Sequence, residues 1–265
     1  MPRKTIILLS GIILLGCTLP NREQKNTQKA SHNKTAPGAQ TAAARTIGDI
    51  SLPEGFRRET AKAGSFAAYL RRIPLKKSKT VYIYNGQPKG NQDAHFAILD
   101  IPVGNKDLQQ CADAVMRLKA EYLFEQERFS EIVFRDNVGG VYAFTAPYTR
   151  PNFERYLQRV FGMCGSASLE KELKPVRDFS DIQSGDVLIR GGFPGHAEIV
   201  VDVAVNDAGE KMYLLAQSYM PAQDIHVVKN PFNDESNPWY DAQAPGNQIV
   251  TPEYVFTRNQ LRRWP

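Results

Sequence analysis

A polar segment near the amino terminus confines folding to the rest of the chain. Residues 18–46 contain no Phe, Tyr, Trp, Val or Ile and are rich in Asn, Gln, Lys, Thr and Ala. Such a segment cannot bury enough apolar surface to offset the conformational entropy that is lost on folding. We therefore expect a flexible tether, followed by a single domain over residues 49–265 that is long enough to bury a sizeable core.

The distribution of charge argues against a nucleic-acid-binding surface. The chain carries a formal net charge of +5, but residues 1–48 alone hold seven Lys or Arg and one acid. Residues 49–265 hold 26 basic and 27 acidic side chains, so the domain itself is nearly neutral. A fold that binds phosphate backbones needs a basic surface. No nucleic-acid partner is expected.

The first residues predict export. Arg3 and Lys4 precede an apolar run of about eleven residues, from Thr5 to Leu15. A membrane-spanning helix needs roughly 20 apolar residues, so this run is too short to span a bilayer. It fits the apolar core of a signal peptide, which follows a short positive region.

The run ends in a motif that predicts a lipid anchor. Leu14-Leu15-Gly16-Cys17 resembles the lipobox of bacterial lipoproteins. The resemblance implies a signal peptide over residues 1–16, a diacylglyceryl group on Cys17 and a tether over residues 17–48. Such a protein is held on a membrane surface in the cell envelope. Thr18 stands where an Asp would argue for inner-membrane retention, so the outer membrane is favoured.

The pattern of apolar residues predicts an α+β fold with a mainly antiparallel sheet. Apolar residues recur at helical spacing from Asp107 to about Gln126. Helices come first and closely spaced strands later, which is typical of α+β proteins. No clear pattern emerges over residues 250–265. The predicted strands are 80–84, 95–101, 131–134, 141–144, 187–190, 197–205, 212–217 and 225–229, and the further helices are 64–73, 151–161 and 168–173.

The most informative stretch is a Gly-Asp turn followed by a histidine at the start of a strand. Gly185-Asp186 opens one apolar strand, and His196 opens the next. This resembles the NlpC-type branch of the papain-like cysteine peptidases and amidases, which cleave peptides of the bacterial cell wall. The resemblance implies a papain-like α+β core at about residues 105–230, with insertions. It also implies that His196 is the general base and that Gln217, on the following strand, orients its imidazole.

That family requires a cysteine at the start of a helix, where the helix dipole and the histidine lower the thiol pKa. Cys111 lies early in the longest predicted helix, and Cys164 precedes a short one. Cys111 is the better nucleophile candidate. Two alternatives stay open: Cys111 belongs to the apolar core, since it lies on the same stripe as Val115, or it forms a disulfide with Cys164.

The sequence gives little indication of other kinds of catalytic or cofactor-binding site. Glu198 and Asp202 follow His196 on the predicted strand at even spacing and so share its face, which makes a cleft lined by acids an alternative. The cysteines and histidines are too scattered for a zinc site. Phosphate-binding and dinucleotide-binding glycine patterns do not occur. No metal or other cofactor is expected.

Several short sequence motifs together resemble those of an uncharacterised family of bacterial lipoproteins, one of the domains of unknown function. They are Gly64-Ser65-Phe66, Cys111-Ala112-Asp113-Ala114 and Gly192-Phe193-Pro194-Gly195-His196. The sequence thus predicts an envelope lipoprotein that is a cysteine peptidase or amidase acting on cell-wall peptides. The competing prediction is an envelope module that binds a wall peptide or glycan without catalysis, with a structural Cys111.

Overall fold

The computed structural model describes residues 44–232 and 238–265. Residues 42–265 form one compact unit. The predicted signal peptide, Cys17 and the tether up to residue 43 lie outside the described residues. The last predicted tether residues already belong to the folded unit, because Ile47 is fully buried and its N–H donates to the carbonyl of Ile73.

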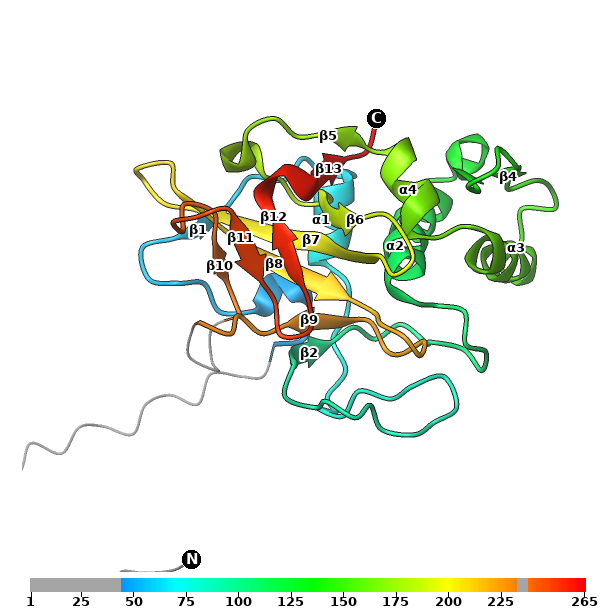
Figure 1. Cartoon of the computed structure of the whole chain (residues 1–265), viewed down its shortest axis with the longest axis horizontal. Helices are drawn as coiled ribbons and strands as arrows, with labels where there is room; N and C mark the ends of the chain where they lie inside the picture. Colours follow the sequence, from blue (N-terminus) through cyan, green and yellow to red (C-terminus); the bar gives the residue numbers. More distant parts are fainter. Residues whose placement is uncertain (1–43, 233–237) are drawn as a thin grey trace, which may run out of the picture. The chain divides into compact units, whose positions relative to one another are not determined.

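An antiparallel sheet forms the centre of this unit (Figure 1). Two further strands pair at its side, and two small hairpins complete the β structure of the described ranges. Along the sheet the order is β2 (His95–Ile98), β9 (His226–Val228), β8 (Lys211–Gln217), β7 (His196–Val205), β6 (Val187–Arg190), β13 (Leu261–Arg263) and β5 (Lys174–Pro175). β1 (Arg57–Arg58) pairs with β7, and β10 (Tyr240–Asp241) pairs with β8. The hairpins are β3 (Val133–Arg135) with β4 (Val141–Ala143), and β11 (Gln248–Val250) with β12 (Val255–Thr257).

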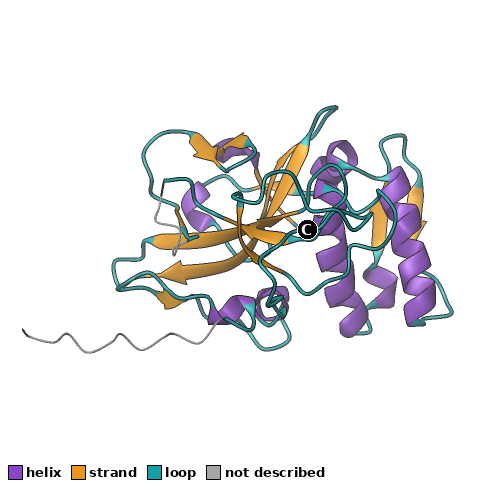
Figure 2. Cartoon of the chain, turned by 90° about the horizontal axis from the view of Figure 1, so that it is seen from below, coloured by secondary structure: helices purple, strands orange, loops and turns teal. Residues whose placement is uncertain are grey.

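The α-helices cover one face of the sheet and gather at one end of it (Figure 2). They are α1 (Phe66–Arg71), α2 (Cys111–Glu125), α3 (Arg150–Met163) and α4 (Ser166–Glu172). α1 and α2 both contact β7, and α4 contacts β6. Within the described ranges, no helix has both the length and the apolar character needed to cross a bilayer.

Both faces of the central strands are covered, which explains their nearly continuous apolar sequence. Ile199 and Val201 of β7 pack in the core that α2 shares. Val200 and Val203 face the opposite way, into a second core that contains Phe256 of β12. The β11–β12 hairpin therefore covers the face of the sheet that the helices leave open (Figure 1).

The predicted α+β class with a mainly antiparallel sheet is confirmed. Two local predictions are wrong. Residues 80–84 make only isolated bridges, at Tyr82 and Ile83, because the segment runs along a loop rather than a ladder. The long helix begins at Cys111 rather than near Asp107, because Gln110 has an extended backbone (φ −89°, ψ −164°) that cannot continue a helix.

A register irregularity overturns the expectation that Asp202 shares the face of His196. β7 pairs Val200 with Leu215 but Asp202 with Leu214, so its alternation breaks between these two residues. Asp202 consequently points to the helix side, where Arg58 and Arg71 bind its carboxylate at 2.8 and 2.6 Å. A bulge of this kind reverses which side chains face each side of a sheet.

Candidate active site

Cys111 occupies the first position of α2, and the residues before it explain why the helix starts there. The N–H of Gln110 donates to the carboxylate of Asp113 at 3.0 Å, which satisfies one amide that the helix leaves without a partner. The Gln110 side chain donates to Asp107 at 3.1 Å. A 15-residue helix places the positive end of its dipole at Cys111, where it favours a thiolate.

His196 is the first residue of β7, and a tightly packed loop sets its position. At Gly195, a Cβ atom would lie 2.2 Å from Oγ of Ser166 and 2.6 Å from the carbonyl oxygen of Arg190. No side chain fits there, so only glycine permits this approach of the loop to the start of α4. Ser166 also donates to the carbonyl of Gly192 at 3.3 Å. The loop therefore fixes where β7 begins.

Cys111 and His196 interact closely enough for each to shift the pKa of the other. Burial raises the pKa of Cys111, but the hydrogen bond and charge of His196 and the N–H groups of Ala112 and Ala197 outweigh it, so the pKa lies below its ordinary value. Burial lowers the pKa of His196, but the hydrogen bonds and charges of Cys111 and Glu198 raise it to about 10. Both shifts favour a thiolate–imidazolium pair over the neutral pair.

Gln217 holds the other side of the imidazole. Nε2 of His196 donates to Oε1 of Gln217 at 2.7 Å, so Nδ1 is the ring nitrogen that remains for the thiol. β7 and β8 are neighbouring strands, which brings the two side chains together. After β8, Ser218 donates to the carbonyl of Gln109 at 2.8 Å. This bond ties the end of β8 to the segment that leads into α2.

The structure thus brings together the three residues that the sequence singled out, Cys111, His196 and Gln217. They are well shielded, because Cys111 is 8% exposed and His196 only 2%. Aromatic rings surround the imidazole: the ring of Tyr219 lies 4.9 Å away between centroids and that of Tyr254 lies 4.8 Å away.

Cys164 has a different environment. It ends α3 as a free, buried thiol, and so does not form the disulfide with Cys111 that the sequence left open. Burial, with the charge of Glu172 as a lesser cause, raises the pKa of Cys164 to about 12. Both cysteines are buried, but the pKa of Cys164 is raised whereas the pKa of Cys111 is lowered.

Of the two acids considered for a cleft, only Glu198 lies at the site. Its Oε1 is 3.5 Å from Nε2 of His196 and accepts a hydrogen bond from Thr251 at 2.8 Å. Its Oε2 has no hydrogen-bond partner among the described residues. No group of three or more His, Cys, Asp or Glu in the described ranges is arranged to hold a metal ion.

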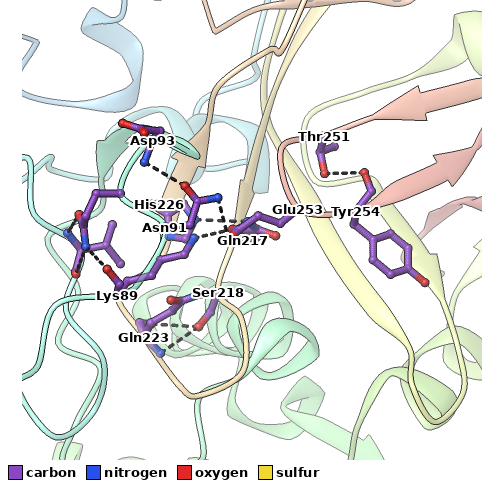
Figure 3. Close-up of polar contacts among 12 residues, drawn as sticks. Lys89, Asn91, Asp93, Gln217, Ser218, Gln223, His226, Thr251, Glu253 and Tyr254 are labelled. Carbon is purple, nitrogen blue, oxygen red and sulfur yellow. Dashed lines mark hydrogen bonds and ion pairs between the residues drawn. The ribbon is translucent and has the colours of Figure 1, made fainter. Parts of the chain in front are cut away.

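Sequence reasoning missed the polar network behind Gln217. Nε2 of Gln217 donates to Glu253 at 2.9 Å and lies 3.3 Å from Nε2 of His226, and Lys89 forms an ion pair with Glu253 (Figure 3). These residues come from β9 and from loops far apart in sequence. The one local sequence signal for the hairpin that carries Glu253 is a short apolar run, Val255 and Phe256, preceded by Tyr254.

The Gly-Asp turn has a structural role. Asp186 is buried and accepts two hydrogen bonds from Arg263, at 2.6 and 2.7 Å. It therefore fastens the carboxyl-terminal strand β13 to the beginning of β6. Gly185 meets the turn's need for a positive φ, at 96°.

Comparison with known proteins identifies the family but no activity. No curated protein and no solved structure matches the chain. Two overlapping stretches, residues 48–146 and 136–263, match the family described as "Domain of unknown function (4846)". These stretches together span nearly the whole described unit, and the chain belongs to that family.

Proposed function

We propose that the protein is a cysteine peptidase or amidase that acts on peptides of the bacterial cell wall. The observation that carries this proposal is the thiol of Cys111 at the first position of α2, whose pKa His196 lowers, with Nε2 of that histidine held by Gln217. A nucleophile, a base and a group that orients the base are the three parts that thiol-dependent acyl transfer requires. The proposed fold relationship is to papain-like enzymes of the NlpC type.

In the proposed reaction, the Cys111 thiolate attacks the carbonyl carbon of an amide and forms a carbon–sulfur bond. His196 gives its proton to the leaving nitrogen as the carbon–nitrogen bond breaks, which leaves an acyl-thioester. His196 then takes a proton from water, whose oxygen bonds to the thioester carbon. The carbon–sulfur bond breaks, the acyl group leaves as a carboxylic acid, and the thiolate of Cys111 is regenerated beside protonated His196. The N–H of Cys111 belongs to the first turn of α2, whose amides lack intrahelical acceptors and can stabilise the oxyanion.

The proposed location is the bacterial cell envelope, with lipid on Cys17 and the outer membrane favoured over the inner. The support is in the sequence: a positive start, a short apolar run, the Leu-Leu-Gly-Cys motif and a polar tether. A domain held near the cell wall by a tether would meet peptidoglycan stem peptides at high local concentration. This makes those peptides the proposed substrate class.

The shielding of the site supports a second candidate, a non-catalytic module that binds a wall peptide or glycan. Cys111 is 8% exposed, and the rings of Tyr219 and Tyr254 lie against His196. Aromatic rings of this kind also make good contact surfaces for ligands. In this case Cys111 would be a packing residue.

Incubation of the protein with soluble peptidoglycan fragments tests the proposal. Release of new amino groups by the wild type, complete loss of release in Cys111→Ala, and retention in Cys164→Ala would support it. Cys164→Ala is the matched control because it also removes a buried thiol. Release that persists in Cys111→Ala would overturn the proposal. Equal binding of the fragments by the wild type and Cys111→Ala, without any release, would favour the binding module.

A further inference from the structure

The amide of Gln217 has a fixed orientation. Its Nε2 donates to Oε2 of Glu253 at 2.9 Å and has Nε2 of His226 as a second neighbour at 3.3 Å (Figure 3). Nδ1 of His226 lies 2.8 Å from the carbonyl oxygen of Asp224 and must donate to it, which leaves Nε2 of His226 as an acceptor in the neutral ring. The pKa of His226 lies well below its ordinary value, mainly because the ring is buried, and the ring therefore stays neutral.

Because both N–H bonds of the amide have acceptors, Oε1 of Gln217 must face His196. A flipped amide would place an NH₂ group against Nε2 of His196 and would favour the ring with its proton on Nδ1. That tautomer cannot accept a proton from the thiol of Cys111. The orientation of Gln217 therefore determines whether His196 can act as a base toward Cys111.

Glu253 is itself held in place. It lies in the turn between β11 and β12 and forms an ion pair with Lys89, which is only 7% exposed. The ion pair joins the carboxyl-terminal hairpin to a loop that lies more than 160 residues earlier in the chain. A charged pair with so little exposure is costly to desolvate, so its presence is weak evidence for a purely stabilising role.

We propose that Glu253 is a positioning residue for the Cys111–His196 pair, and that it acts by fixing the amide of Gln217. This rests on the proposed function, since it assigns a role within the same site. Lys89 supports Glu253, and the β11–β12 hairpin is thereby part of the active-site architecture rather than only a cover for the sheet.

Other ionisable groups also surround the pair, and each is unchanged in the variants below. They are Glu198 of β7, His226 of β9, Asp113 of α2, Tyr219 after β8 and Tyr254 of the hairpin turn.

Two double variants of the full chain isolate the hydrogen bond. Lys89→Met/Glu253→Gln removes both charges but keeps an acceptor for Gln217, whereas Lys89→Met/Glu253→Ala removes the charges and the acceptor. The readout is the rate of iodoacetamide labelling of Cys111 from pH 5.5 to 9, followed by peptide mass spectrometry. Cys164 reports unfolding, because burial raises the pKa of its thiol to about 12 and it should stay unlabelled in a folded chain over this pH range. This readout requires no substrate.

The glutamine variant should keep the wild-type rate and pH profile. The alanine variant should lose about tenfold in rate near neutral pH, the scale found for outer hydrogen-bond partners of metal-binding histidines, and its midpoint should move to higher pH. If the alanine variant unfolds, the labelling rate of Cys111 is measured in Glu253→Asp instead. This substitution withdraws the carboxylate by one methylene and should also lower the labelling rate.

Equal profiles in the glutamine variant and in the alanine or aspartate variant would overturn the positioning role while leaving the proposed function intact. A wild-type Cys111 that labels no faster than Cys164 would overturn the proposed function, and the positioning role with it.

Discussion

The carboxylate of Glu198 lies 3.5 Å from Nε2 of His196, and both side chains are almost completely buried. Gln217 contacts the same nitrogen at 2.7 Å. The neutral amide can orient the ring but adds no charge, whereas a carboxylate this close stabilises the imidazolium directly. The two residues therefore divide the tasks of orienting His196 and of keeping it protonated.

Glu198→Gln should make Cys111 less reactive near neutral pH. The substitution keeps an oxygen for the hydroxyl of Thr251 but removes the negative charge beside His196. Without that charge the pKa of His196 falls, the imidazolium is less stable, and the thiolate loses its counter-ion. The midpoint of the Cys111 labelling profile should rise by about one pH unit, the lower end of what a neighbouring charge contributes. An unchanged midpoint would contradict this role.

Asp202→Asn is the matched control on the same strand. Asp202 is a buried acid bound by Arg58 and Arg71 on the helix side of β7, away from His196. Breaking such a pair should lower the free energy of unfolding by about 3 kcal/mol, measured by denaturant titration, while the Cys111 profile stays as in the wild type. A shift equal to that of Glu198→Gln would mean that loosening of β7, rather than charge, governs the thiol.

Gly195→Ala should displace the loop before β7 and so lower the reactivity of Cys111. The new methyl group would meet Ser166 and Arg190 well inside contact distance, so the loop must move and carry His196 with it. We expect a loss of about 2 kcal/mol in unfolding free energy and a lower rate of Cys111 labelling. In Gly162→Ala, where a Cβ has open space within α3, stability should be equal or slightly higher and labelling unchanged. Wild-type labelling in Gly195→Ala would show that the loop does not position His196.

The sequence was most informative where local pattern and local structure coincide. His196 and Gln217 could be placed on neighbouring strands because each ends or begins an apolar run. The start of α2 was misplaced because Leu108 continues the apolar stripe by chance, while the extended backbone of Gln110 ends it.

Contacts between segments that are far apart in the sequence could not be predicted from local apolar patterns. The Lys89–Glu253 pair depends on how a loop and a terminal hairpin meet in space. The bulge that turns Asp202 to the other face of β7 depends on pairing with β8, which no alternation within β7 reveals. Alternation predicts which residues share a face only while the register is regular.

Cys17→Ser tests the proposed anchor. In a bacterial host, the wild type should sediment with membranes and begin, by mass spectrometry, at an acylated Cys17. The serine variant should lack the acyl mass and leave the membrane pellet, because one hydroxyl cannot replace the lipid. Cys164→Ala should remain anchored. Sedimentation of the serine variant with membranes to the same extent as the wild type would contradict lipid attachment at Cys17.

The most direct test of the central claim is the pH dependence of alkylation of Cys111 and Cys164 in the same wild-type molecule, without reductant. Both cysteines are buried, but the shifts in their pKa values have opposite directions, so the pH at which each thiol begins to react distinguishes them. The pKa of Cys111 lies below its ordinary value, so its labelling should rise at lower pH than that of an ordinary thiol, whereas Cys164, with a pKa of about 12, should stay inert until strongly basic pH. Equal labelling of the two thiols, or a Cys111 rate that rises only near the ordinary thiol pKa of about 8.5, would contradict an activated nucleophile.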